Sequence, residues 1–214
     1  MRSRFTRILA GTLIAGSLAL AAPVAQASTI AELSIEQMTD VSTWIVRGKV
    51  VDTWTELDDR GYVWTRARVQ VDQAFKGLSP KSEVIVDSLG GTWGDVTTDV
   101  PGRAEFSKGE EMLVFLAEIG KDARLVPVAK FHGKLSIRRA PGESRSYGMR
   151  WHPDRAITFD ARFLPHPAPA SRIYIDDVEK RILSRLESGW DGEDVPGIRR
   201  EDIQKINARA KRLR

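Results

Sequence analysis

The 214-residue sequence contains no cysteine and only three histidines. The absence of cysteine excludes disulfides, thiol catalysis and lipid attachment to an N-terminal cysteine. His132, His152 and His166 are scattered, and no H-E-x-x-H, H-x-x-x-H or G-x-S-x-G pattern occurs. We therefore expect no catalytic residues, no metal and no cofactor. A hydrolase site assembled from carboxylates or histidines that lie far apart in the sequence stays open.

The first 27 residues have the composition of an export signal. Arg2, Arg4 and Arg7 precede an apolar stretch rich in small residues, and Ala-Gln-Ala at 25–27 forms a small-x-small cleavage site. The apolar stretch is short for a membrane-spanning helix. The pattern predicts cleavage after Ala27 and export to the periplasm or out of the cell. Membrane contact is then expected only through the signal peptide.

The net charge of +4 is distributed unevenly along the chain. Without the three signal arginines, the 33 basic residues fall to 30, against 29 acidic residues. Residues 198–214 hold seven of these basic residues and two of the acidic ones, so residues 28–197 carry a net charge of −4. The body of the protein therefore lacks the basic surplus of a nucleic-acid-binding domain.

Short segments rich in β-branched residues predict a mainly β domain. In residues 62–75, Val63, Thr65, Ala67, Val69 and Val71 fall on one face of a strand, and Trp64, Arg66, Arg68, Gln70 and Asp72 fall on the other. This alternation is typical of a sheet with one solvated face. Further strands are predicted at 44–54, 83–89, 110–118, 124–131 and 134–139. Their number and spacing favour a five- to six-stranded OB-like barrel.

Helices are expected on both sides of the strand region. Ser34 and Gln37 have capping-box spacing, which predicts a short helix within 31–42. Val178, Ile182 and Leu186 form the apolar stripe of a helix over 171–189, and a basic helix follows at 199–212. The expected organisation is a signal peptide (1–27), a barrel (28–139), an irregular proline-rich connector with one more possible strand at 156–163 (140–170), and a C-terminal helical segment (171–214).

Three segments carry a family resemblance in their order along the chain. They are Trp-Ile-Val-Arg-Gly-Lys-Val-Val at 44–51, Ala-Phe-Lys-Gly at 74–77 and the strand motif at 106–116. Together they resemble the netrin-like (NTR) domain of the tissue inhibitors of metalloproteinases, over about residues 32–139. They are also similar to uncharacterised bacterial secreted proteins. The resemblance implies a five-stranded OB-type barrel with terminal helices. Those inhibitors bind the protease zinc through an N-terminal cysteine, whereas this mature chain would begin at Ser28.

The segment 88–102 contains Gly90, Gly91 and Gly94 directly after a predicted strand. A dinucleotide fingerprint requires a helix after its glycines and a P-loop requires Gly-Lys-Ser/Thr, and neither follows here. The glycines therefore predict bends and bulges in a long loop between strands. Long loops in small barrels often bind partners, so Gly90, Gly91 and Trp93 are candidate binding residues.

The polar face of the first predicted hairpin is the second candidate surface. It is expected to present Arg47, Lys49, Trp64, Arg66 and Arg68. An exposed indole ring among basic groups can stack on a base, a sugar or an aromatic side chain while the basic groups pair with an anion. The alternative is an ordinary solvated face on which the C-terminal helices cover Trp64.

The sequence therefore predicts an exported, non-enzymatic binding module. Its expected partner is a protein of unknown identity or an anionic polymer at the cell envelope, and the basic C-terminal tail could touch such a polymer or anionic lipid. Two alternatives stay open. One is a protease inhibitor of the same fold, and the other is a hydrolase with dispersed catalytic residues.

Overall fold

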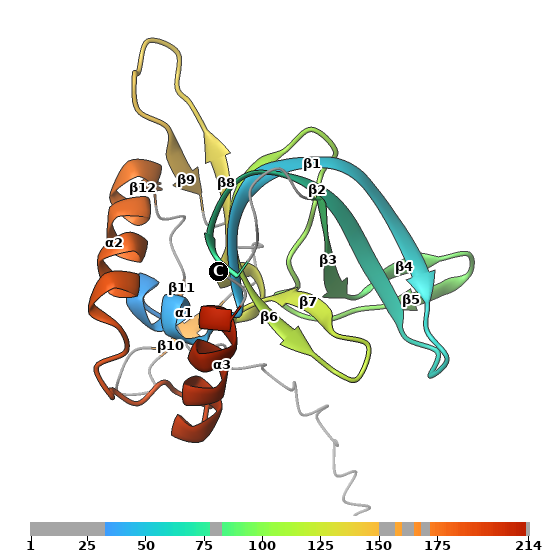
Figure 1. The fold of residues 1–214 in the computed structure, drawn as a ribbon. Coiled ribbons are helices and arrows are strands. Elements are labelled where there is room, and N and C mark those ends of the chain that lie inside the picture. The colour runs from blue at the N-terminus through green and yellow to red at the C-terminus, as the bar shows by residue number, and fades with distance from the viewer. Residues whose placement is uncertain (1–32, 78–82, 150–156, 160–164, 168–171, 213–214) are drawn as a thin grey trace, which may run out of the picture.

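A computed structural model describes residues 33–77, 83–149, 157–159, 165–167 and 172–212 (Figure 1). The predicted signal peptide lies outside these ranges. Within them, no helix is both long and apolar enough to cross a membrane.

One antiparallel sheet forms most of the structure. Its strand order is β12-β9-β8-β6-β1-β2-β3, and β7 pairs with β6. The bounds of these strands are β1 (Trp44–Leu57), β2 (Val63–Lys76), β3 (Glu83–Leu89), β6 (Glu111–Ile119), β7 (Arg124–Pro127), β8 (Lys134–Arg138), β9 (Tyr147–Met149) and β12 (Arg172–Tyr174). Two small hairpins complete the described strands: β4 (Gly91–Trp93) with β5 (Val96–Thr98), and β10 (Ile157–Phe159) with β11 (Pro165–Pro167).

Strong curvature of the β1–β2 ribbon gives the sheet its shape (Figure 1). The register of β1 on β2 shifts at three places, one of them between Val50 and Asp52. Such irregularities bend a strand and increase its twist. Gly48 adds to the effect, since a Cβ atom there would lie 2.2 Å from the carbonyl oxygen of Gln70. The missing side chain allows the two backbones to approach closely at the bend.

The curvature brings β3 beside β7, but hydrogen bonds do not close the sheet. Among the described residues, no ladder joins these two strands. The mainly β class is confirmed, whereas a closed barrel of five to six strands is not. The sheet has eight strands because β9 and β12 extend it beyond β8. These strands have three residues each, too few to show an alternating pattern in the sequence.

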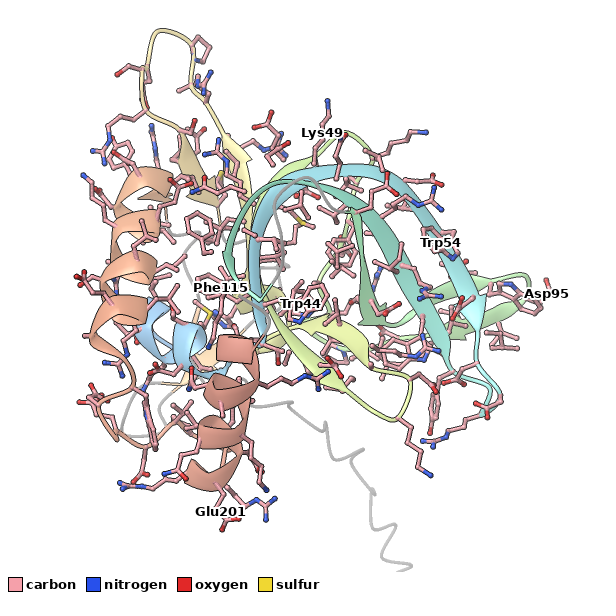
Figure 2. All side chains as sticks on the ribbon, in the orientation of Figure 1. Trp44, Lys49, Trp54, Asp95, Phe115 and Glu201 are labelled. Carbon is pink, nitrogen blue, oxygen red and sulfur yellow. The ribbon has the colours of Figure 1, made fainter. Side chains whose placement is uncertain are left out.

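The sheet carries an apolar core on each face. On the concave side, Val46, Val69, Val86, Met112 and Val114 belong to one core. On the other side, helices α1 (Ile35–Val41), α2 (Ile175–Ser188) and α3 (Arg200–Arg212) complete a second core (Figure 1). Strand β6 is buried on both faces: Phe115 points toward the helices (Figure 2), and its neighbour Val114 points the other way. This double burial explains the unbroken apolar run of β6.

The three predicted helices are present with adjusted ends. The side chains of Ser34 and Gln37 make the expected capping box at the start of α1. Val178 and Ile182 of α2 are fully buried in the second core. The predicted region 171–189 begins as strand β12 and becomes helical at Ile175.

Two other predicted segments differ from the structure. The expected strand 124–131 ends at Pro127, because the chain turns there into the 3-10 helix η1 (Lys130–Gly133). Ala129 and Lys130 have positive φ angles of 49° and 58°, which are incompatible with a continuing strand. The expected connector 140–170 contributes β9 to the sheet. Gly148 makes this possible, since a Cβ atom there would lie 3.1 Å from Leu135 and Ile175.

Candidate functional site

The glycine-rich segment folds into the β4–β5 hairpin. Gly91 pairs with Thr98, Trp93 pairs with Val96, and the chain reverses at Gly94. Gly91 has a φ angle of +132°, and a Cβ atom there would lie 2.6 Å from Thr65 Oγ1. The glycine therefore lets the hairpin lie directly on β2. Gly90 also has a positive φ angle, of +115°. Both glycines therefore adopt backbone conformations that other residues rarely adopt.

Threonine side chains fasten this hairpin to the β1–β2 hairpin. Thr55 Oγ1 donates to the carbonyl of Thr92 over 2.9 Å, and Thr65 Oγ1 donates to the carbonyl of Gly90 over 2.7 Å. The Val63 amide donates to Thr98 Oγ1 over 3.0 Å. These bonds hold two hairpins together at one end of the molecule (Figure 1). The sequence did not predict that the β4–β5 hairpin packs on the β1–β2 hairpin.

Trp64, Arg66 and Arg68 lie on one face of β2, as predicted, and Trp54 of β1 joins them. Trp54 is directly opposite Arg66, and the guanidinium carbons of Arg66 and Arg68 lie 5.6 and 5.7 Å from its ring centre. Arg124 of β7 stacks over Trp64 at 4.7 Å. We call these five residues the Trp–Arg face.

Two carboxylates neutralise much of this face. Arg66 donates from Nε to Asp87 Oδ1 over 2.7 Å and from Nη1 to Glu56 Oε2 over 2.9 Å. Arg124 Nη1 lies 3.3 Å from Glu56 Oε1 and 3.8 Å from Asp87 Oδ1. The Asp87 side chain is only 2% exposed. Burial raises the pKa of Asp87, although the two arginines act in the opposite direction.

Trp64 is held by neighbours within the sheet. Its Nε1 donates to Asp58 Oδ2 over 2.9 Å, and this bond lowers the pKa of Asp58. Arg124 lies over its ring. The apolar stripe of α2 packs into the core beside α1 instead. The alternative in which the C-terminal helices cover Trp64 does not hold, because α2 and α3 pack around Ile45, Leu113 and Phe115, away from Trp64.

Arg47 and Lys49 are separated from the other predicted residues. Arg47 Nη1 pairs with Glu179 of α2 at 3.1 Å. Lys49 projects into solvent, well away from Trp54 (Figure 2). Arg47 and Lys49 are opposite Gln73 and Gln70 of β2, so distance along the hairpin separates them from the Trp–Arg face. The register shift between Val50 and Asp52 brings Trp54 opposite Arg66, which strict alternation along β1 does not predict.

An open groove of about 410 Å³ lies between β3 and β7, beside the Trp–Arg face. Arg66, Asp87 and Arg124 line it together with the exposed carboxylates Glu83 and Asp122. Its volume is within the range of sites that hold small molecules or parts of polymers. The face and the groove together bring aromatic rings, arginines and carboxylates to one accessible surface.

A second polar cluster is packed into the protein. Lys134 Nζ lies 2.7 Å from Glu110 Oε1, and the Ser136 hydroxyl donates to the same oxygen. The side chains of Lys134 and Glu110 are 9% and 10% exposed, and burial lowers the pKa of Lys134. A serine beside a lysine is a pairing used in catalysis, but here both groups are bonded to Glu110 and enclosed. This cluster therefore stabilises packing. Across the described residues, no group of three or more acidic or histidine side chains could hold a metal ion.

No protein-family model matches the chain, and a search of curated proteins found no match. The resemblance to the NTR domain accordingly stays a prediction.

Proposed function

We propose that the protein is an exported, non-enzymatic binding module that holds a polysaccharide of the cell envelope on the Trp–Arg face. The observation that carries the proposal is the arrangement of Trp54 and Trp64 beside arginines and carboxylates at an open groove. An indole ring offers a flat apolar surface to the C–H groups of a sugar, and its neighbours can bond the hydroxyl groups.

The balance of charge favours a ligand rich in hydroxyl groups over a polyanion. Arg66 and Arg124 are each paired with Glu56 and Asp87, so little positive charge is left for phosphates or sulfates. A guanidinium has five N–H donors, more than these carboxylates engage. The paired arginines can therefore still donate to sugar hydroxyls while the carboxylates accept from them.

The curvature of the sheet supports the same proposal. Strands β1, β2, β3, β7 and β6 enclose the concave core, and we propose that they are the equivalent of the OB-type barrel that the sequence resemblance implies. Barrels of this type bind oligosaccharides and oligonucleotides on a strand face flanked by loops. The Trp–Arg face has that position on β2, beside the β1–β2 turn and the start of β7.

A fluorescence titration of residues 28–214 tests the proposal. The ligands are neutral and anionic envelope polysaccharides, peptidoglycan fragments and oligonucleotides. We expect saturable binding of polysaccharide that Trp54→Ala or Trp64→Ala weakens about tenfold, or about 1.4 kcal/mol. Trp190→Phe is the matched control, since Trp190 lies next to α2 and donates to the carbonyl of Glu193. Absence of binding, or equal binding by all variants, would contradict the proposal.

Salt dependence separates this ligand class from an anionic polymer. A nearly neutral face predicts an affinity that changes little between low and physiological salt. A steep decrease with salt would instead indicate a polyanion held by Arg68, Lys49 and the basic tail.

A protease inhibitor of the same fold remains the alternative, because the sequence resemblance favours it. Inhibition of secreted metalloproteases by the mature chain would support this alternative, and inactivity across a panel would remove it. A hydrolase would need carboxylates free to exchange protons, whereas Glu56 and Asp87 are both bonded to Arg66.

A further inference from the structure

Three large apolar side chains are exposed on the two joined hairpins. Tyr62 at the β1–β2 turn is 51% exposed, and Trp93 and Val96 of the β4–β5 hairpin are 48% and 39% exposed. Trp93 and Val96 are directly opposite each other on neighbouring strands. We call Tyr62, Trp93 and Val96 the hairpin tip. Tryptophan and tyrosine are enriched among the residues that dominate protein–protein binding energies.

The backbone beneath the hairpin tip is firmly held. The three bonds made by Thr55, Thr65 and Thr98 join the hairpins, and the Gly90 amide also donates to the carbonyl of Val63 over 2.8 Å. A surface that is already ordered loses little conformational entropy when a partner binds. The hairpin tip is therefore prepared for binding in a way that a loose loop is not.

Charges around the hairpin tip indicate what kind of surface it can approach. Asp95 lies in the turn between Trp93 and Val96, Asp99 follows β5, and Asp58, Asp59 and Arg60 lie in the β1–β2 turn beside Tyr62, so the two hairpin ends carry a net charge of −3. The bond from Trp64 lowers the pKa of Asp58, which is therefore ionised at neutral pH. Such a rim is repelled by anionic lipid and by a second hairpin tip, and it is attracted by basic side chains.

We propose that the hairpin tip docks into a partner protein whose apolar pocket is rimmed by basic side chains, with Trp93 as the group that enters the pocket. This contact is independent of the proposed polysaccharide site, because Trp93 is not part of the Trp–Arg face. A variant can therefore lose binding at one surface and keep binding at the other.

Photo-crosslinking followed by titration tests the docking surface. A photoreactive residue is placed at Val96 in the full chain within the producing cells, and at Leu183 as a control. Leu183 is 52% exposed and belongs to α2, a helix that is remote from the two hairpins (Figure 1). The protein crosslinked through Val96 is identified, purified and titrated with the wild type and with Trp93→Ala.

We expect one protein to crosslink at Val96 and not at Leu183. Its affinity should fall at least about tenfold with Trp93→Ala, as for a central interface residue, and should weaken as salt is raised. Because Trp93 is half exposed, we expect Trp93→Ala to keep the fold, and thermal unfolding at an unchanged temperature verifies this. The proposal would be overturned by equal labelling from both positions or by equal affinity of the partner for the wild type and Trp93→Ala. It would also be overturned if the crosslinked partner were a second copy of this chain, or if the protein bound phosphatidylglycerol vesicles instead.

Discussion

Asp87 and its arginines illustrate how single residues act in this protein. The carboxylate is almost fully buried, and burial raises its pKa above the ordinary value of 3.8. The ionised form is therefore less favourable in the folded chain than in the unfolded chain. This group stabilises the fold most at pH values below 3.8, and that contribution is lost as the pH rises through the raised folded value. At neutral pH the carboxylate depends on Arg66 and Arg124.

Removal of one arginine tests that dependence. We expect Arg66→Met to lower the free energy of unfolding by about 2–3 kcal/mol at pH 7, because it leaves a buried carboxylate with a weaker partner. The loss should be smaller at pH 4, because the pKa of Asp87 is raised further without Arg66 and a protonated Asp87 needs no counter-charge. Urea denaturation at the two pH values measures both effects. Arg68→Met, on the same face of β2 but exposed, should change stability by only about 0.5 kcal/mol. Equal losses for both variants would contradict this account.

The buried pair of Lys134 and Glu110 provides a second test. We expect Glu110→Gln to reduce stability by about 3–5 kcal/mol, because the buried Lys134 would lose the carboxylate with which it is paired. Replacing both residues, as Lys134→Met with Glu110→Leu, should cost much less, since no buried charge then remains. Thermal and urea unfolding of the single and double variants decide the point. A double variant that is less stable than the single one would show that the pair itself supplies net stability.

Among the elements, α2 connects the C-terminal region to the sheet. Its buried face holds Val178 and Ile182 in the core beside α1. Its flanks carry ion pairs, of Glu179 with Arg47 on β1 and of Arg185 with Asp40 on α1, at 3.1 and 2.7 Å. Apolar burial positions the helix, and the ion pairs fix its rotation and register.

Two neighbouring residues of α2, one buried and one exposed, test how the helix packs. We expect Ile182→Ala to lower the free energy of unfolding by about 2–5 kcal/mol, because the side chain is fully buried and its loss leaves a cavity. Leu183→Ala, one residue further on, should change it by less than about 0.5 kcal/mol. Urea unfolding compares the two variants. Similar values would mean that α2 does not pack on the second core.

At the scale of the whole molecule, the sheet needs its helices. Phe115, Leu113 and Ile45 face α1, α2 and α3, so one face of β1 and β6 would be bare without them. Strands β9 and β12 also extend the same sheet from the C-terminal side. Strands β9 and β12 and helices α2 and α3 are thus integral to the fold.

Truncation tests this integration. We expect residues 28–139 alone to lose cooperative unfolding and to bind the apolar dye ANS, because removal of α2 and α3 exposes the core around Phe115. Thermal unfolding followed by circular dichroism, with dye fluorescence, compares the fragment with residues 28–214. A fragment with a sharp transition at the temperature of the longer chain would show that the helices are dispensable.

The sequence by itself determined the mainly β class, the strand cores, the three helices and the position of Trp64, Arg66 and Arg68 on one face of β2. Local patterns suffice for these features, because burial on one side of a strand or helix imposes a period that a few residues reveal. The capping box at Ser34 is likewise a contact between near neighbours in the chain.

Only the tertiary structure decided which distant residues meet. One extra residue in β1, Val51, placed Trp54 on the same face as Arg66, and a register shift leaves little trace in composition. The curvature of the sheet brought Arg124 of β7 over Trp64 and close to Asp87. The β4–β5 hairpin came to lie on β2 because Gly91 lacks a side chain. Pairings across tens of residues depend on the packing of the whole molecule, so no local pattern specifies them.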